Sequence, residues 1–589
     1  MHLNILALDL DGTLAKDGIV ADETWQALRN MKAAGFVLIL VTGRRLSVIP
    51  GIGPFDEICE AVIAENGATI YFPRSDTTVT PFGRLAPEVI QKLEGLGREI
   101  EFGVAIAATW IPHDREVLHI LSDTGYAATV EYNKGAVMIL PPGATKGSGL
   151  KYALEELGYS TRNVIACGDA ENDRSMFEQA DLSVAVANAI PAIRDLADTV
   201  LNQPNGAGSR QMMGQLLAGK IPPYRCRPQR RIQLGQNTEG DPVCLSPFNL
   251  LDSNWGIVGS SGTGKSWLAG MIMEQLLRIG YQVCVIDPEG DYRSIRAFPR
   301  TIVLGSDFSS PPSVGDVITL LEYARVSIIL DLTLYKRDEK ITYVREFMQA
   351  LSGIRAKRGL PHWFLIDEAH YFCHTEGEHL SDLFLENAQR GGFTFVTYYP
   401  DALPKKLLQG IDHWMFTQIN HQATINVLRK NIRPQEKSCD LDELRQLNAR
   451  ELYLCLGDTP QLSAPASGIV RLDGVNRSTQ HVRHLHKYLL APLPTDKQFY
   501  FHVSAPDPGV RPAASLWEFR QALPKLPVKT IKFHLERHDF EKWLTEVIHD
   551  DELARQVRKL AGRPVKDEQL KEALAATVAN RFDELESLI

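Results

Sequence analysis

The sequence predicts an α/β protein, and two observations support that fold class. Short apolar runs alternate with segments of helical periodicity, both in the first 215 residues and in the centre of the chain. Polar and charged residues gather where several of these runs end, and the carboxyl ends of parallel strands meet at one edge of a sheet. The pattern therefore predicts mainly parallel sheets with helices on both faces.

Composition limits the class of protein further. The 589 residues are 44% hydrophobic and 23% charged, which is typical of a globular protein with three or four domains. The net charge of -9 disfavours a chain that is wrapped in nucleic acid, so any contact with DNA must come from local basic patches. No apolar run is long enough to span a membrane, and the eight cysteines form no CxxC pair. We expect reduced thiols, no membrane contact and a cytoplasmic location.

The first apolar run, residues 3–10, carries two carboxylates at its end. Asp9 and Asp11 are two residues apart, and side chains at that spacing share one face of a strand. Such a pair suits a nucleophile that accepts a phosphoryl group and a neighbour that moves protons, provided that Mg²⁺ screens their repulsion. The alternative is a solvated Asp-Gly turn.

Further polar groups follow later runs of the same region. Residues 37–41 precede Thr42, Lys146 follows a Pro-Pro-Gly turn, and residues 164–167 lead into an acidic segment. That segment contains two more carboxylates, the oxygen ligands that a hard cation prefers. Four polar sites at successive strand ends favour a functional origin over chance.

These motifs resemble those of haloacid-dehalogenase-type phosphatases. The chain has DLDGT at Asp9, VTGR at Thr42, the isolated Lys146 and GDAENDRSM at Asp169. Residues 1–215 are thus similar to the Cof-type (class IIB) phosphatases, which implies a Rossmann-like domain with an α/β cap at about residues 75–145. Such caps select the substrate, here a small phosphorylated molecule.

The resemblance also implies residue roles. Asp9 is then the nucleophile and Asp11 the general acid/base. The phosphate-binding groups are then Thr42, Lys146 and Asn172, and the Mg²⁺ ligands are Asp9, Asp11, Asp169 and Asp173.

Residues 216–245 differ in composition, because they are rich in proline and arginine and include a hairpin-like turn at 235–241. This segment is expected to be a linker between domains. Its arginines can contact DNA phosphates or simply be solvated, and the sequence leaves both interpretations open.

The central part contains a Walker A pattern after the apolar run 255–258. Glycines let the backbone turn so that N–H groups converge on phosphate oxygens, a lysine adds a cation and a hydroxyl reaches Mg²⁺. The expected ATP-binding residues are Gly259, Gly262, Thr263, Gly264, Lys265 and Ser266. A Walker B strand ends in Asp367, a Mg²⁺ ligand together with Ser266, and in Glu368, the catalytic base.

Six apolar runs in this part predict parallel strands at 255–258, 283–286, 301–304, 326–332, 364–366 and 393–398. With the Walker pair, they make residues 246–490 resemble HerA/FtsK-like P-loop ATPases. That resemblance implies a homo-hexameric ring, double-stranded DNA as a candidate partner, and a catalytic role for Arg390 at a neighbour's nucleotide. The chain departs from the family pattern at Tyr398, where a glutamine usually senses the γ-phosphate.

Residues 497–589 are predicted to begin with a strand at 499–503 and to continue as helices, because apolar residues recur there at three- and four-residue spacing. Phe540 and Trp543 are expected core residues. This region resembles a small family of unknown function, and we interpret it as an interaction or oligomer-capping domain.

Two functions remain open at this stage. One is a bifunctional enzyme, a Mg²⁺-dependent phosphatase joined to an ATP-hydrolysing motor that translocates DNA. The other is an ATP-binding switch that assembles a ring and positions the phosphatase domains with little motor activity. Glu368 favours the motor, and Tyr398 favours the switch.

Overall fold

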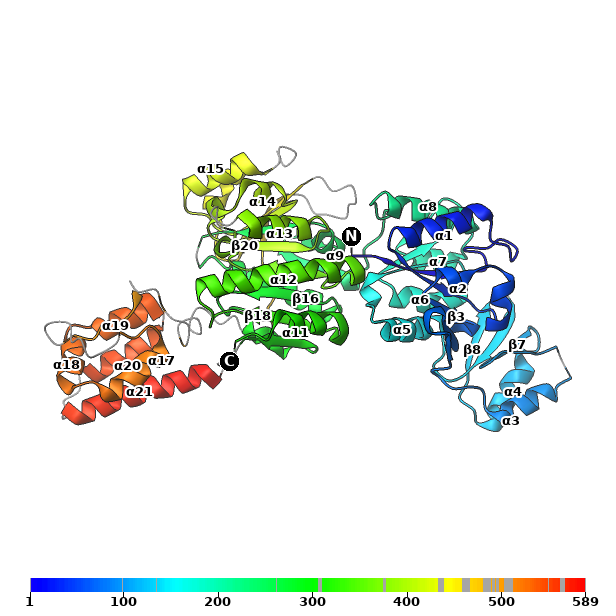
Figure 1. Cartoon of the computed structure of the whole chain (residues 1–589), viewed down its shortest axis with the longest axis horizontal. Coiled ribbons are helices and arrows are strands. Elements are labelled where there is room, and N and C mark those ends of the chain that lie inside the picture. The colour runs from blue at the N-terminus through cyan, green and yellow to red at the C-terminus, as the bar shows by residue number, and fades with distance from the viewer. Residues whose placement is uncertain are drawn as a thin grey trace.

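The computed structural model shows three units in a row (Figure 1). The N-terminal unit extends from strand β1 to helix α8, the central unit from β13 to β23, and the C-terminal unit from α17 to α21. The structure describes the whole chain except residues 1, 98, 134, 261, 306–309, 374–377, 433–438, 458–466, 480–488, 490–492, 494–496, 503–511, 549, 562–566 and 588–589.

The N-terminal unit is built on an eight-stranded sheet in the order β12-β11-β10-β1-β2-β3-β4-β5. The first six of these strands run parallel, and β4 and β5 are antiparallel. The bounds are β1 (Ile5–Asp9), β2 (Val37–Val41), β3 (Ala61–Ala64), β4 (Thr69–Phe72), β5 (Thr77–Val79), β10 (Val164–Gly168), β11 (Leu182–Ala185) and β12 (Thr199–Val200).

Helices cover both faces of this sheet, as alternating side chains of buried strands require. One apolar core packs the sheet against α1 (Asp22–Ala33), α2 (Phe55–Ile58) and α8 (Asn205–Leu217). The core on the other face includes α5 (Lys146–Leu157), α6 (Arg174–Gln179) and α7 (Pro191–Leu196).

A cap lies beside this sheet, at the lower right of Figure 1. It has its own antiparallel sheet in the order β6-β7-β9-β8, packed against two helices. Its elements are α3 (Pro87–Glu94), β6 (Glu101–Phe102), β7 (Ala107–Trp110), α4 (Asp114–Thr124), β8 (Thr129–Asn133) and β9 (Ala136–Leu140). The cap is thus α/β and falls inside residues 75–145.

The central unit contains an eleven-stranded sheet in the order β14-β13-β23-β22-β21-β15-β20-β19-β16-β18-β17. The six predicted strands are present and parallel, and β21 adds a seventh. These strands are β15 (Trp255–Val258), β16 (Val283–Asp287), β17 (Thr301–Leu304), β18 (Ser327–Asp331), β19 (Trp363–Ile366), β20 (Phe393–Thr397) and β21 (His413–Phe416).

An antiparallel extension follows, with β22 (Glu451–Leu456) and β23 (Gly468–Arg471). Apolar cores lie on both faces of the sheet. The helices of this unit are α9 (Pro247–Leu251), α10 (Lys265–Arg278), α11 (Val314–Thr319), α12 (Arg337–Arg358), α13 (Glu378–Ala388), α14 (Lys405–Gln409) and α15 (Gln422–Asn431).

The segment expected to be a linker contains regular structure. Strands β13 (Ile232–Gln236) and β14 (Pro242–Leu245) form a hairpin, and β13 also pairs with β23. The hairpin forms one end of the central sheet, so its apolar side chains belong to that core. The linker is therefore shorter than 216–245. The hairpin-like turn expected at 235–241 does join two strands, and the pairing of β13 with β23 makes them part of the central sheet.

The C-terminal unit is helical around a compact aromatic and aliphatic core. Phe540 and Trp543 are buried in it, and Leu489 and Leu493 also join it. The predicted strand at 499–503 is instead an isolated bridge between Phe499 and Ala513. The helices are α17 (Leu516–Ala522), α18 (Val528–Glu536), α19 (Asp539–Trp543), α20 (Asp551–Ala561) and α21 (Asp567–Ser587).

Two further expectations concern the whole chain. The structure pairs Cys439 and Cys455 in a disulfide, which corrects the expectation that all thiols are reduced. The two cysteines are 16 residues apart, and only the fold brings their Cα atoms to 5.6 Å.

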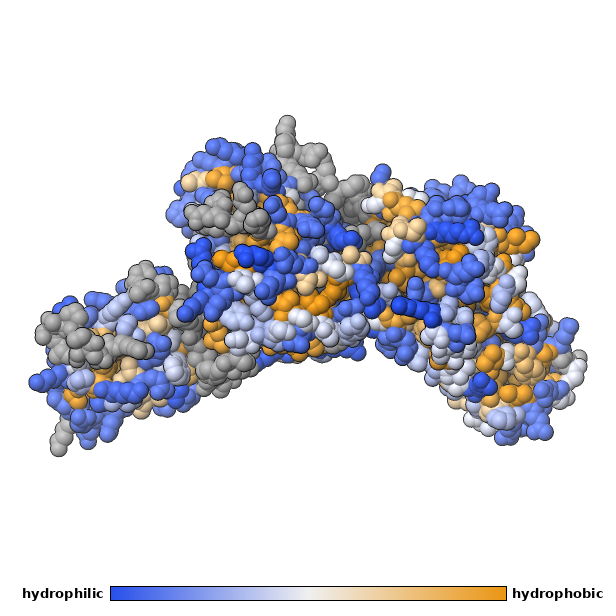
Figure 2. Space-filling model, viewed as in Figure 1, coloured by the Kyte–Doolittle hydropathy of each residue, from blue (hydrophilic) through white to orange (hydrophobic). Residues whose placement is uncertain are grey.

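Within the described residues, no helix combines the length and the apolarity that crossing a bilayer requires. The face in Figure 2 accordingly mixes hydrophilic areas with separate apolar ones.

The start of the chain joins the N-terminal and central units (Figure 1). The buried imidazole of His2 lies 3.0 Å from Asp181, which precedes β11, and 3.0 Å from Asp252 of the central unit. The hydroxyl of Tyr281 donates to Asp181 at 2.9 Å. Burial disfavours the charged imidazole, but the two carboxylates outweigh it and raise the pKa of His2 to about 9.

This contact predicts a pH-dependent stability. The pKa of His2 is raised in the folded protein, so its contribution is complete below pH 6.5 and is lost as the pH rises through about 9. The expected loss is about 3 kcal/mol. Urea unfolding at pH 6.5 and pH 9.5 measures it, and His2→Gln should flatten the dependence. The exposed His119→Gln is the control, and an equal slope in both variants would contradict the assignment.

Candidate functional site

The first site lies at the carboxyl ends of β1, β2 and β10. Asp9 is the last residue of β1, and Asp169 and Asp173 follow β10. All three are buried, and one carboxylate oxygen of each lies within 4.8 Å of the others. The parallel register of β1 with β10 brings these distant residues together.

Lys146 begins α5, and the capping box formed by Thr145 with Ser148 fixes that helix start. The ammonium group of Lys146 is buried and donates to Asp9 at 2.6 Å and to Asp173 at 2.7 Å. The other oxygen of Asp173 accepts from the backbone N–H of Asp169 at 2.7 Å. Lysine and carboxylates thus form one rigid constellation.

The charge of this constellation is unbalanced. Burial, together with repulsion from Asp173, raises the pKa of Asp9 well above its usual range, although Lys146 opposes the shift. The cluster has three buried carboxylates, and Lys146 pairs with two of them, Asp9 and Asp173. A divalent cation with oxygen ligands fits such a cluster, because it would neutralise the excess negative charge.

The remaining predicted residues surround the cluster. Thr42 is buried at the end of β2, and the Asn172 amide donates to Asn66 at 2.9 Å. Asp11 lies outside the carboxylate group that the described residues form and pairs instead with Arg44, at 2.6 Å and 2.7 Å. Its side chain is 42% exposed, so it faces the opening of the site.

The cap contributes a residue that the sequence did not indicate. Glu131 lies on β8, and burial raises its pKa to about 7, with opposing influences from Lys146 and Asp173. One of its carboxylate oxygens is buried without a hydrogen-bond partner among the described residues. Its neighbour in the cap sheet, Met138, accepts a hydrogen bond from Asn66. The cap therefore closes directly over the acidic cluster.

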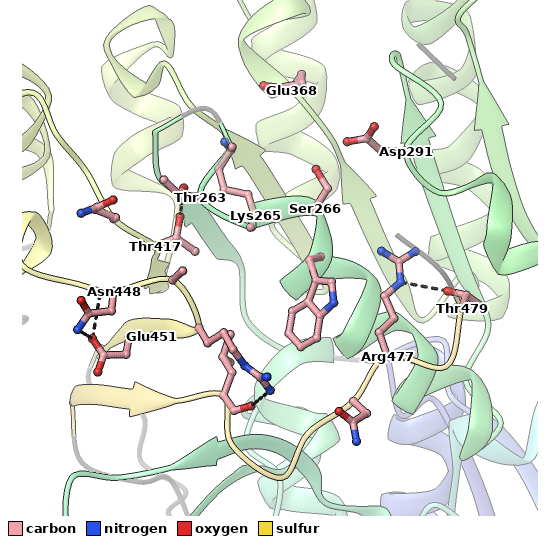
Figure 3. Close-up of a pocket in the computed structure, with 18 residues that line it drawn as sticks. Thr263, Lys265, Ser266, Asp291, Glu368, Thr417, Asn448, Glu451, Arg477 and Thr479 are labelled. Atoms are coloured by element: carbon pink, nitrogen blue, oxygen red, sulfur yellow. Dashed lines mark hydrogen bonds between the residues drawn. The ribbon is translucent and has the colours of Figure 1, made fainter. Parts of the chain in front are cut away.

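The second site lies where β15 ends and α10 begins (Figure 3). Gly262 and Gly264 adopt positive φ angles of 78° and 97°, which form the turn of the loop. Gly259 must lack a side chain, because an added Cβ would overlap the Thr417 hydroxyl. The Lys265 ammonium bonds the carbonyl of Ser260 at 3.1 Å, and burial lowers its pKa while Glu368 and Asp367 oppose that shift.

A cavity of about 830 Å³ opens at this loop. Its volume is within the range of sites for small molecules and cofactors. Gly262, Thr263, Gly264, Lys265 and Ser266 line it, together with Glu368. Residues that the sequence analysis missed complete the wall: Asp291, Thr417, Asn448, Arg450, Arg477 and Thr479. The two arginines come from the segments before β22 and after β23, and Figure 3 shows Arg477 beside Thr479.

The Walker B residues lie at the end of β19. Asp367 is 1% exposed, and neither carboxylate oxygen has a hydrogen-bond partner among the described residues. Burial and the charge of Glu368 raise the pKa of Asp367 well above its usual range. An orphaned buried carboxylate fits a place for hydrated Mg²⁺. Glu368 has a left-handed backbone, with φ 44°, and lies 3.3 Å from His370.

Of two residues that the sequence singled out, Tyr398 lies near Lys265 of the nucleotide loop and Arg390 lies outside the cavity. The ring of Tyr398 is 5.8 Å from the Lys265 ammonium, so the tyrosine does occupy the vicinity of the nucleotide loop. Arg390 follows α13, is exposed and does not line the cavity. The structure of one chain therefore does not bring Arg390 to its own nucleotide site.

The two sheets and their sites define a hydrolase with a phosphatase domain and a P-loop ATPase domain. The family model of the haloacid dehalogenase-like hydrolases matches residues 6–97 and 114–211, and the model of the central domain of helicase HerA matches residues 232–351. The chain belongs to the haloacid dehalogenase-like hydrolases and carries a HerA central domain downstream.

Curated relatives match the N-terminal unit. Phosphoglycolate phosphatase 2 of Saccharolobus solfataricus is 31% identical over 226 residues, which cover 37% of this chain and 94% of the relative. Phosphoglycolate phosphatase of Methanothermobacter thermautotrophicus is 31% identical over 220 residues, 35% of this chain and 95% of the relative. A haloacid dehalogenase-like hydrolase structure from Bacteroides thetaiotaomicron is 19% identical, with a TM-score of 0.32, and the match covers 36% of this chain and 99% of that chain.

Proposed function

We propose that this protein is a bifunctional enzyme of the cytoplasm. Residues 1–215 hydrolyse a phosphomonoester with Mg²⁺, residues 232 to about 490 hydrolyse ATP in a ring, and residues 497–589 mediate interactions. The buried cluster of Asp9, Asp169 and Asp173 around Lys146 carries the first activity. The orphaned Asp367 beside the nucleotide loop supports the second.

In the phosphatase, a carboxylate oxygen of Asp9 attacks phosphorus and the bond to the ester oxygen breaks, which gives an aspartyl-phosphate and an alcohol. Asp11 gives the leaving oxygen a proton and then takes one from the water that hydrolyses the intermediate. Lys146, Thr42 and Asn172 hold the phosphoryl oxygens. Asp9, Asp169 and Asp173, with Asp11 as the fourth expected ligand, would hold the Mg²⁺, which when bound would screen the charge between the nucleophile and the phosphate.

The names of the relatives make phosphoglycolate the first substrate to test. Glu131 gives a reason to test hydroxylated phosphate esters as well as phosphoglycolate. A carboxyl group in the cap accepts hydrogen bonds from substrate hydroxyls, and in its charged form it repels a substrate carboxylate. A panel of both ester classes measured with the full chain decides between them.

In the ATPase, the loop N–H groups and Lys265 hold the phosphates, and Glu368 orients and deprotonates the attacking water. Ser266 and Asp367 would hold the Mg²⁺, which when bound would screen the charge of the phosphates. Arg450 adds an exposed positive charge to the cavity wall that complements a triphosphate, whereas the side chain of Arg477 is buried and lies 3.5 Å from Glu274.

The resemblance to HerA/FtsK-like ATPases assigns Arg390 to a neighbour's nucleotide, and its exposed position outside the cavity of its own chain is compatible with that role in a ring. We expect a homo-hexamer in ATP and Mg²⁺ by light scattering. Arg390→Ala should retain ATP binding and lose roughly a hundredfold of the turnover. The exposed Arg445→Ala is the matched control. A monomer with full turnover would refute both the ring and this role of Arg390.

Tyr398 favours a second candidate, an ATP-binding switch that positions the phosphatase domains without sustained turnover. A tyrosine ring near Lys265 can contact a nucleotide, but it has no amide to orient water. ATP turnover with and without double-stranded DNA discriminates the two. Strong stimulation by DNA supports a translocating motor, whereas nucleotide-dependent assembly with negligible turnover under both conditions supports the switch.

A further inference from the structure

A groove of about 350 Å³ lies between the N-terminal and central units, away from both sites. The N-terminal unit contributes the end of α5 and the turn at Arg162, and the central unit contributes residues from the end of α10 to the start of β16. Arg162 crosses the junction and donates to the carbonyl of Ile279 at 2.8 Å. The groove therefore exists only while the two units are joined.

The lining of the groove is strongly positive. It includes four cationic side chains and one acidic one, which are Lys151, Arg162, Arg300, Arg325 and Glu155. Arg325 donates to the carbonyls of Leu154 and Glu155, at 2.9 Å each. Within the described part of the chain, the ammonium of Lys151 and the guanidinium of Arg300 make no hydrogen bond or ion pair, and both residues are exposed at the rim.

Two polar groups in the wall are also unsatisfied. Gln282 is only 6% exposed, and its amide oxygen has no hydrogen-bond partner among the described residues. One terminal nitrogen of Arg162 is buried without such a partner, and its contact with Asp181 is long, at 3.6 Å. Native structures rarely leave buried polar groups unpaired. The unpaired Arg162 nitrogen can donate to an anion, whereas the Gln282 oxygen is an acceptor and needs a hydroxyl or N–H donor on the ligand.

We propose that this groove binds a small phosphorylated anion. Four cations from both units converge on a concave surface that has only one acid, and planar guanidinium groups match phosphate geometry. The volume is at the low end of small-molecule sites, so it suits a phosphate or pyrophosphate group with a small attachment rather than a polymer. Free phosphates and the phosphate end of a nucleotide share this chemistry.

Two helices, α5 and α10, connect the groove with the two active sites. Lys146 begins α5 and Lys265 begins α10, and each lysine belongs to one of the two sites. The last turns of both helices border the groove, through Leu154 and Leu277. A helix is a rigid element, and these two span about 18 and 21 Å at 1.5 Å per residue. A bound anion would therefore stabilise the joined arrangement of the two units at the far ends of the helices that carry the two lysines.

The test uses the full chain with Lys265→Ala, which weakens phosphate binding at the nucleotide loop. Calorimetric titration with pyrophosphate is repeated after adding Lys151→Glu and Arg300→Glu. We expect at least tenfold weaker binding from that pair. Lys525→Glu with Lys529→Glu, an equal charge change on exposed lysines of the C-terminal unit, should leave the affinity unchanged. Hydrogen exchange should show protection of residues 151–158 and 277–282 by pyrophosphate in the unmutated groove.

Several outcomes decide the matter. Equal affinity with and without the groove substitutions would overturn the proposal, as would binding of a 30-base-pair DNA but of no small anion. Separate titrations with inorganic phosphate and AMP distinguish a free phosphate from a nucleotide as the source. If the glutamate pair does not fold, judged by thermal melting, Lys151→Ala with Arg300→Ala replaces it and must still weaken binding.

Discussion

Replacing Asp9 with asparagine is expected to abolish phosphomonoester hydrolysis, with a loss of about a thousandfold or more. The change removes the attacking oxygen's charge and one of two carboxylates that Lys146 bonds. The amide keeps the size of the side chain, so the fold should persist. Because the nucleotide loop lies in another unit, ATP affinity should not change.

Hydrolysis of 4-nitrophenyl phosphate and equilibrium binding of labelled ATP provide the two readouts. Asp195→Asn is the matched control, because Asp195 is exposed on α7 and outside the acidic cluster. Wild-type hydrolysis by the Asp9 variant would show that another group is the nucleophile. A parallel loss of ATP affinity would show that the substitution acts through the fold.

Lys265→Ala and Glu368→Gln are expected to separate binding of ATP from its hydrolysis. The first removes a buried ammonium from the nucleotide loop and should weaken ATP binding roughly a hundredfold. The second keeps the shape of the side chain but removes the base, so ATP should bind normally while turnover falls roughly a hundredfold or more.

Nucleotide titration and phosphate release measure the two quantities separately. Lys406→Ala is the control for Lys265, because Lys406 is an exposed lysine of α14. If both active-site variants lost binding to the same extent, the division of roles between Lys265 and Glu368 would be wrong. Phosphatase activity should stay near the wild-type rate in both.

The fold class and the central strands were predictable because their signals are local. A buried strand that ends in Asp9, or a glycine loop that leads into Lys265, is visible in a few consecutive residues. Parallel topology fixes where strand ends meet, which is why Asp9, Asp169 and Asp173 lie together, whereas Asp11 pairs with Arg44 outside that group. The roles assigned to those residues remain predictions.

The residues that were missed depend on contacts between distant segments. Arg450 and Arg477 reach the nucleotide cavity from the antiparallel end of the sheet, and no local motif marks them. Glu131 looks like an ordinary exposed residue of an alternating strand until the cap covers the acidic cluster. The hairpin before Ser246 was taken for linker because its pairing with β23 spans more than 200 residues.

Asp181 limits how this protein can be divided. Its buried carboxylate belongs to the phosphatase sheet region, yet its neighbours His2, Arg230 and Tyr281 come from both ends of the phosphatase and beyond it. A protein shortened to residues 1–217 would lose Arg230 and Tyr281, so the carboxylate of Asp181, now buried, would lie at a new surface with His2 and Arg162 as its remaining cationic partners. A phosphatase shortened at residue 217 would therefore need a replacement for Asp181, or new partners for it, at the surface that the cut exposes.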